Sequence, residues 1–287
     1  MRRVLAAIMV ATFVAWLAAP VARAYQLVAG HASEVRPPAD LAVEDVIFGN
    51  ADAPLSGWLV RATQGAPAVV LAHGFKSSRE EMLPWARFLH DAGYNVLLFD
   101  TRACGKSGGT TVGLGAIEAQ NIALAAGSAK DAFAAGRVGV LGISLGAGAA
   151  ILAAASDPDI RAVVADSAWT DQDLQLSRLS SLPIGPVRIP LPPFGIVAVN
   201  AIVGADVTGA RPIDVIARVA PRPLLLIHSA DDDNATTTVD GARRLFDAAG
   251  EPKQLWIAPR GGHVGAINAF PDEYRSRVLA FFRDALR

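Results

Sequence analysis

Hydrophobic residues along the chain fall into short runs, and longer segments of mixed polarity separate these runs. The runs are rich in Val, Leu and Ile, a composition typical of parallel strands that are buried on both faces. They predict seven strands, at Trp58–Ala62, Ala68–Ala72, Asn95–Asp100, Val138–Leu141, Ala162–Asp166, Leu224–His228 and Gln254–Ala258. The segments between them predict helices at Arg79–Ala92, Ile117–Ala135, Ser144–Ala155, Val239–Ala249 and Pro271–Leu286. This alternation predicts an α/β fold with a mostly parallel, doubly wound sheet.

Residues 170–221 interrupt the alternation with closely spaced prolines, as in Leu182-Pro-Ile-Gly-Pro186 and Ile189-Pro-Leu-Pro-Pro-Phe-Gly195. Proline removes a backbone donor and breaks both helices and central strands. The segment is longer than an ordinary connection, and such insertions are often lids or binding loops. We expect a lid or cap insertion at about 170–221; a surface excursion without a function is the alternative.

The N-terminus has the layout of a signal peptide. A basic start, Met1-Arg2-Arg3, precedes an apolar stretch, and small residues at Ala22 and Ala24 suit a signal peptidase. We expect cleavage after Ala24, a linker over residues 25–42 and one domain over residues 43–287. An uncleaved anchor is the alternative, because residues 4–22 are nearly long enough to span a bilayer. Under both interpretations the basic start predicts an extracytoplasmic domain.

Composition narrows the classes of function. Of 287 residues, 52% are hydrophobic and 18% are charged, so the chain can bury a large core. A formal net charge of −1 gives no reason to expect nucleic acid as a partner, and contact with a membrane is expected only through an uncleaved N-terminal segment. Cys104 is the single cysteine, which excludes an internal disulfide and a zinc site built from cysteines.

The stretch Gly142-Ile-Ser144-Leu-Gly146 follows a predicted strand and begins a predicted helix. A nucleophilic serine at a strand-to-helix turn needs small residues two before and two after it, and both are glycine here. The start of the helix also stabilises negative charge beside Ser144. Ser144 is therefore a candidate nucleophile, with a structural turn serine as the alternative.

A serine hydroxyl needs an adjacent base, and the chain has five histidines. His263 lies in a glycine-rich loop, after the last predicted strand and before the last helix, where an imidazole can reach the strand ends. A carboxylate must orient that base, and Asp231, Asp232 and Asp233 follow another predicted strand. The chemistry alone does not choose among these three aspartates.

An oxyanion hole requires two backbone donors. The amide after the nucleophile, that of Leu145, is one candidate. The other is the amide of Phe75, which follows the predicted strand Ala68–Ala72 and the turn residue Gly74. His73, in the same loop, is expected to be structural.

Three segments together resemble the α/β-hydrolase superfamily, over about residues 43–286. They are Val69-Val-Leu-Ala-His-Gly-Phe75, Asn95-Val-Leu-Leu-Phe-Asp-Thr-Arg-Ala-Cys-Gly-Lys-Ser-Gly-Gly109 and Leu224-Leu-Leu-Ile-His-Ser-Ala-Asp-Asp232. The nearest branch looks like the serine-aminopeptidase-like hydrolases, single-pass or secreted. In that family the catalytic aspartate comes four residues after the histidine of the third segment. The resemblance therefore implies Asp232, and it implies the chain order Ser144, Asp232, His263.

The chain departs from the family pattern at Ala103, Ser229 and Asn121, which affects the choice of branch rather than the chemistry. The resemblance implies a serine hydrolase that cleaves small or medium acyl esters through an acyl-enzyme, with no cofactor and no metal. A serine at the strand-to-helix turn argues against a dehalogenase or an epoxide hydrolase, because these enzymes of the family have an aspartate at that position.

The substrate remains open. Trp169 and apolar residues of the insertion, Leu191, Phe194 and Ile196, are expected to line an acyl pocket. A peptidase, a thioesterase or a perhydrolase of the same fold is an alternative, as is a catalytically idle binding module of the cell envelope.

Overall fold

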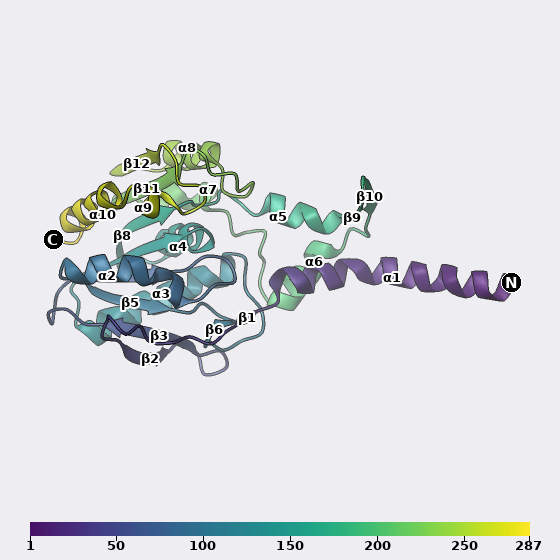
Figure 1. Ribbon diagram of the computed structural model, residues 1–287, viewed down its shortest axis with the longest axis horizontal. Coiled ribbons are helices and arrows are strands. Elements are labelled where there is room, and N and C mark those ends of the chain that lie inside the picture. Colours follow the sequence, from purple (N-terminus) through teal and green to yellow (C-terminus); the bar gives the residue numbers. More distant parts are fainter.

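An eight-stranded sheet forms the centre of the protein in the computed structural model, which describes residues 1–287 (Figure 1). Its strand order is β12-β11-β8-β7-β4-β5-β3-β2. The strands are β2 Glu44–Phe48, β3 Leu55–Val60, β4 Ala68–Ala72, β5 Asn95–Phe99, β7 Val138–Ile143, β8 Ile160–Asp166, β11 Leu224–Ser229 and β12 Lys253–Ala258. The six strands from β12 to β5 are parallel, and β3 and β2 are added antiparallel at one edge. The predicted α/β fold with a mostly parallel sheet is confirmed.

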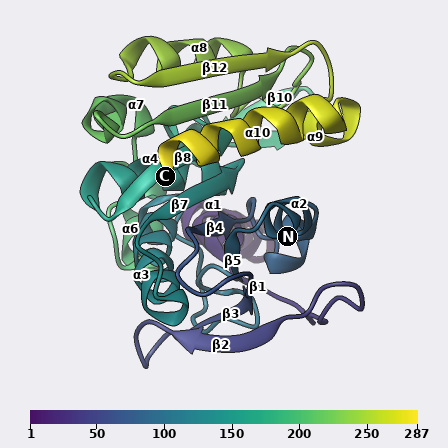
Figure 2. The same cartoon turned by 90° about the vertical axis from the view of Figure 1, so that its left-hand side faces the viewer.

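Helices cover both faces of this sheet, as Figure 2 shows. On one face lie α3, Ala116–Phe133, α4, Leu145–Ser156, and α8, Val239–Ala248. On the other lie α2, Leu83–Asp91, and α10, Pro271–Ala285, with the short α9, Ala266–Ala269.

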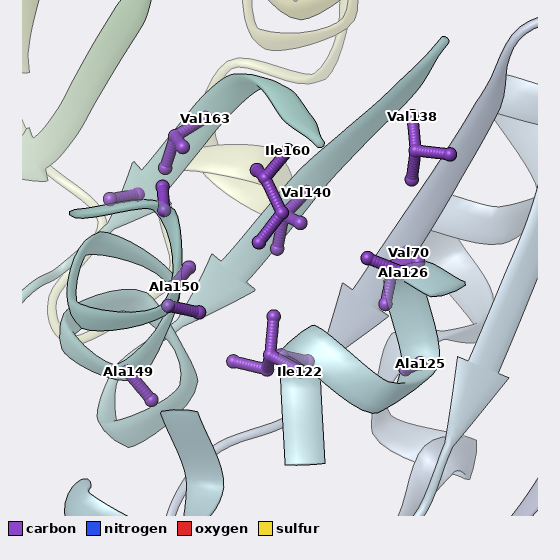
Figure 3. Close-up of a cluster of buried hydrophobic side chains, with 14 of the residues drawn as sticks. Val70, Ile122, Ala125, Ala126, Val138, Val140, Ala149, Ala150, Ile160 and Val163 are labelled. Atoms are coloured by element: carbon purple, nitrogen blue, oxygen red, sulfur yellow. The ribbon is translucent and has the colours of Figure 1, made fainter. Parts of the chain in front are cut away.

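Alternation along the strands explains the two layers. Val70, Val140 and Val163 pack toward α3 and α4, while their neighbours Leu71, Leu141 and Val164 belong to the cluster on the α2 and α10 side. Figure 3 shows the first cluster, in which alanine side chains of α3 and α4 let these helices approach the sheet closely. This packing fixes the start of α4, and therefore the end of β7, where Ser144 lies.

Each of the seven predicted strands is present, with ends that shift by up to three residues. The sequence predicts no strand at β2, because this edge strand is largely exposed and lacks the run of apolar residues seen in the central strands. The predicted helix at Arg79–Ala92 begins as a 3₁₀ turn, Arg79–Met82, and becomes α-helical at Leu83.

The proline-rich insertion forms short elements at the carboxyl edge of the sheet (Figure 1). These elements are α5 Asp173–Ser177, a 3₁₀ turn Arg178–Ser180, the hairpin β9 Ser181–Ile184 and β10 Val187–Pro190, and α6 Gly195–Val203. Its last part, α7 Pro212–Val215 and a 3₁₀ turn Ile216–Val219, packs with the α4 layer instead. The longest of these elements, α6, lies where the sequence has no proline, between Pro193 and Pro212.

The N-terminal helix α1 runs from Arg2 to Val28 and extends away from the body (Figure 1). It is the one helix that is long and apolar enough to cross a membrane, and it continues through the expected cleavage point after Ala24. Beyond it, β1, His31–Ala32, pairs in parallel with β6, Cys104–Gly105. Residues 25–42 are therefore tied to the domain at both the helix and this short ladder.

Candidate active site

Ser144 lies on a sharp turn between β7 and α4, with φ of 51° and ψ of −116°. Residues other than glycine rarely adopt a positive φ, and a serine with this backbone conformation is typical of a functional turn. A Cβ on Gly142 would lie 2.2 Å from the Gly146 carbonyl oxygen, and a Cβ on Gly146 would lie 2.4 Å from the Ala72 carbonyl oxygen. Both flanking residues must therefore be glycine for the turn to form.

His263 and Asp232 meet Ser144 from two other loops. The Nε2 atom of His263 lies 2.8 Å from the Ser144 Oγ, and the Nδ1 atom lies 2.9 Å from Asp232 Oδ2. An imidazole that donates its Nδ1–H to the carboxylate presents the Nε2 lone pair to the serine hydroxyl. The three residues expected from the sequence are brought together in the order serine, histidine, aspartate.

The carboxylate of Asp232 is fully buried but well supplied with donors. The Asn234 amide donates to Oδ1 at 2.9 Å, the Thr237 hydroxyl donates to Oδ2 at 3.4 Å, and His228 Nε2 lies 3.3 Å from Oδ2. Burial alone would raise the pKa of Asp232, but hydrogen bonds from His228, His263 and Asn234 outweigh it. The pKa of Asp232 is therefore held well below its usual range, and the carboxylate stays ionised at neutral pH.

The neighbouring aspartates have different surroundings. Asp231 accepts a hydrogen bond from the Gly262 amide at 2.8 Å, so it holds the loop that carries His263. Asp233 is exposed and has no partner among the hydrogen bonds or ion pairs of the chain. The geometry therefore agrees with the choice of Asp232 that the resemblance implied.

Phe75 and Leu145 line a small cavity next to Ser144. Neither backbone amide donates a hydrogen bond to another group of the chain, so both are free to bind an anionic oxygen. The loop before Phe75 comes close to the nucleophile, since a Cβ on Gly74 would lie 3.6 Å from the Ser144 Cβ.

The cavity has a volume of about 40 Å³ and is lined by nine residues. Several of these residues are not predicted from the sequence. Trp169 was expected and is present, with its Nε1–H donating to the Leu145 carbonyl at 3.1 Å. The other walls are Leu114 and four polar residues that the sequence does not predict: Gln172, Gln175, Thr236 and Thr237. Nothing in their local pattern marks them, because they reach the cavity only when the insertion and the β11 loop fold over it.

The expected apolar lining from Leu191, Phe194 and Ile196 was wrong. None of them borders the cavity at Ser144. Leu191 faces a groove beside α1, and the side chain of Ile196 is exposed on α6. The hairpin carries this part of the insertion away from the sheet edge.

Two features behind the site are structural. His73 is buried, its Nδ1–H donates to the Gly74 carbonyl and its Nε2 accepts from the Thr101 amide, and burial lowers its pKa. Arg79 forms a buried ion pair with Asp100 at 2.8 Å, and Asp100 also accepts from the Lys106 amide. These contacts hold the loops that precede Phe75 and α3.

No group of three or more His, Cys, Asp or Glu side chains is arranged to hold a metal ion. Cys104 is buried, and burial raises the pKa of its thiol to about 11, so it stays protonated and is a poor nucleophile. The arrangement at Ser144 places a hydroxyl, an imidazole and two residues with unpaired backbone amides at one cavity. Groups of these kinds can carry out acyl transfer.

The sequence and the fold of the chain are similar to those of known proteins. A family model described as alpha/beta hydrolase fold matches residues 67–181. The chain is 28% identical to YfhR of Escherichia coli O157:H7 over 81% of this chain and 77% of that protein. It is 29% identical to YqkD of Bacillus subtilis over 79% of this chain and 74% of that protein. Both relatives are uncharacterized.

Among solved structures, the esterase Pf2001 of Pyrococcus furiosus superimposes with a TM-score of 0.70 and 26% identity, covering 90% of this chain and 99% of that one. The α/β hydrolase GrgF from a Penicillium species has a TM-score of 0.66 and 22% identity, over 86% of this chain and 99% of that one. These likenesses agree with the α/β fold described above.

Proposed function

Because the chain belongs to the α/β-hydrolase superfamily and is a hydrolase by fold, we propose that it is a serine hydrolase acting on small acyl esters. One observation carries the proposal. Ser144 Oγ, His263 and the buried Asp232 form a continuous chain of contacts of 2.8 and 2.9 Å at a strained turn. A strained backbone conformation costs free energy, and such conformations are found mostly at functional sites.

The reaction begins when the Ser144 hydroxyl attacks the ester carbonyl carbon while His263 Nε2 takes its proton. The carbonyl oxygen becomes negative and accepts hydrogen bonds from the amides of Phe75 and Leu145. Asp232 stays ionised and stabilises the imidazolium. When the tetrahedral intermediate collapses, the alcohol leaves with the proton from His263 and the acyl group remains on Ser144.

Water then attacks the acyl-enzyme. His263 takes a proton from the water, the same two amides hold the second oxyanion, and the proton returns to Ser144 as the acid leaves. Every group needed for both halves belongs to this chain, and the reaction requires no cofactor.

The size of the cavity favours short acyl groups. A volume of about 40 Å³ is small beside the roughly 300–1,000 Å³ of pockets that hold larger ligands. A long acyl chain would have to displace Gln175 or Thr236. We expect acetyl and propionyl esters to be better substrates than octanoyl esters.

The test is hydrolysis of p-nitrophenyl esters by the wild-type protein and by Ser144→Ala. We expect wild-type kcat/KM to fall from the acetate to the octanoate, and Ser144→Ala to lower kcat by about 10³-fold or more. Full esterase activity of Ser144→Ala would refute the proposal. A panel that also contains amide and thioester analogues separates the esterase from a peptidase or a thioesterase.

A further inference from the structure

The carboxyl-terminal half of α1 is packed into the fold. Ala24 and Val28 are completely buried, in one cluster with Val199 and Val203 of α6. The Arg23 guanidinium donates to the Arg178 carbonyl at 2.7 Å, a contact between α1 and the turn before the hairpin. Cleavage after Ala24 would remove Arg23 and Ala24 and uncover part of the buried face of α6.

The other half of α1 has no comparable cover. No charged residue occurs between Val4 and Ala22, and nineteen residues of helix extend about 28 Å, close to the hydrocarbon thickness of a bilayer. Side chains are exposed on all sides of the helix from Val4 to Ala18, with Val10 63% and Val14 56% exposed. A helix that is apolar all round is suited to lipid, because a single protein partner would cover only one of its sides.

The β9–β10 hairpin stands beside this apolar part of α1, away from the sheet (Figure 1). The Trp16 indole donates to the Pro190 carbonyl at 2.8 Å. Between α1 and the hairpin lies a groove of about 600 Å³, lined by eleven residues of which ten are hydrophobic, such as Phe13 and Leu182. The hairpin therefore lies level with the apolar residues of α1 that are together long enough to cross a bilayer.

The hairpin itself has a composition that tolerates lipid. Ile184 and Val187 are more than half exposed, and Arg188 is the only charged residue between Ser180 and Pro193. An arginine stem is long enough to bring its charge to the headgroups. Pro183 and Pro190 carry no N–H, which reduces the unpaired backbone donors at the edges of the hairpin.

We propose that α1 is retained as a single membrane span and that the β9–β10 hairpin inserts beside it into the outer leaflet of a phospholipid bilayer. The basic Met1-Arg2-Arg3 end then lies on the cytoplasmic side. The cap rests on the membrane surface, and the edge of the sheet that carries Ser144 faces the bilayer.

The test places an environment-sensitive fluorophore, NBD, on Val187→Cys in the full-length chain, reconstituted in vesicles of phosphatidylethanolamine and phosphatidylglycerol. Leu124→Cys is the matched control, because Leu124 is exposed on α3, far from the hairpin. Cys104 is buried, and the unmutated chain measures any label that it takes. A thermal melt verifies that each variant is folded, and Ile189→Cys replaces Val187→Cys if that one is not.

The hairpin label is expected to be quenched by spin-labelled lipid and to have an iodide quenching constant about ten-fold below that of the α3 label, as for a probe in hydrocarbon. Equal access of iodide to both labels would overturn the insertion of the hairpin. The mass of the protein isolated from whole cells of the expressing bacterium tests retention: an intact α1 is expected, and a chain that starts at Tyr25 would overturn it.

Discussion

At the scale of single residues, three adjacent aspartates have three different surroundings. Asp232 holds His263, Asp231 holds the Gly262 amide, and Asp233 is free in solvent. Ser144 and His263 could be predicted from the sequence because a turn serine and a loop histidine have local signatures. Thr237, which contacts both Asp232 and the His263 ring, could not, because only the folded loop brings it there.

The aspartates therefore provide a matched series. Asp232→Asn should lower kcat by about 10³- to 10⁴-fold, because an amide cannot hold the His263 tautomer or stabilise its positive form. Asp231→Asn, which weakens only the hold on the loop, should have a much smaller effect, and Asp233→Asn should match the wild type. The measurement is kcat for p-nitrophenyl acetate at neutral pH. A loss for Asp233→Asn as large as that for Asp232→Asn would contradict these roles.

At the scale of elements, the central strands were predictable because burial on both faces leaves unbroken apolar runs. The edge strand β2 and the β9–β10 hairpin were not, since both are largely exposed and the hairpin is rich in proline. The junction of β7 with α4 is tightly constrained, because backbone atoms approach both Gly142 and Gly146 at contact distance.

Gly142→Ala should destabilise the protein by more than about 2 kcal/mol, because its Cβ would overlap backbone that cannot move without shifting α4. Gly127→Ala is the control. Gly127 is exposed within α3 and an added Cβ meets nothing within 4 Å, so alanine should stabilise by about 0.5–1 kcal/mol. Chemical unfolding of the two variants and the wild type measures both changes. Equal stability of Gly142→Ala and the wild type would show that the turn has room.

At the scale of the whole molecule, the sequence predicted the layered domain but not how the N-terminal segment joins it. The apolar pattern of α1 is the same for a signal peptide and for a span, whereas its packing against α6 depends on residues about 175 positions away.

Stability is likewise a property of the whole fold, and one buried acid makes it depend on pH. Burial raises the pKa of Asp166 to about 6, against opposing hydrogen bonds from Tyr274 and Ser167.

An acid whose pKa is raised by folding binds its proton more tightly in the folded state, so this contribution to stability is full below about pH 4 and is lost as the pH rises through 6. Asp166→Asn cannot titrate. The free energy of unfolding of the wild type minus that of Asp166→Asn should therefore fall between pH 4 and pH 7, by up to about 3 kcal/mol. Chemical unfolding at both pH values checks it, and a difference that rises with pH would contradict the raised pKa.

The central claim is that Ser144 is a nucleophile activated by His263, and covalent labelling with a fluorophosphonate tests it most directly. Mass spectrometry of the digested protein should find the phosphonyl adduct on the peptide that contains Ser144, formed more slowly in His263→Ala and absent in Ser144→Ala. A wild-type protein that takes no adduct, or takes it on another residue, would contradict the account and favour a binding module with an idle triad.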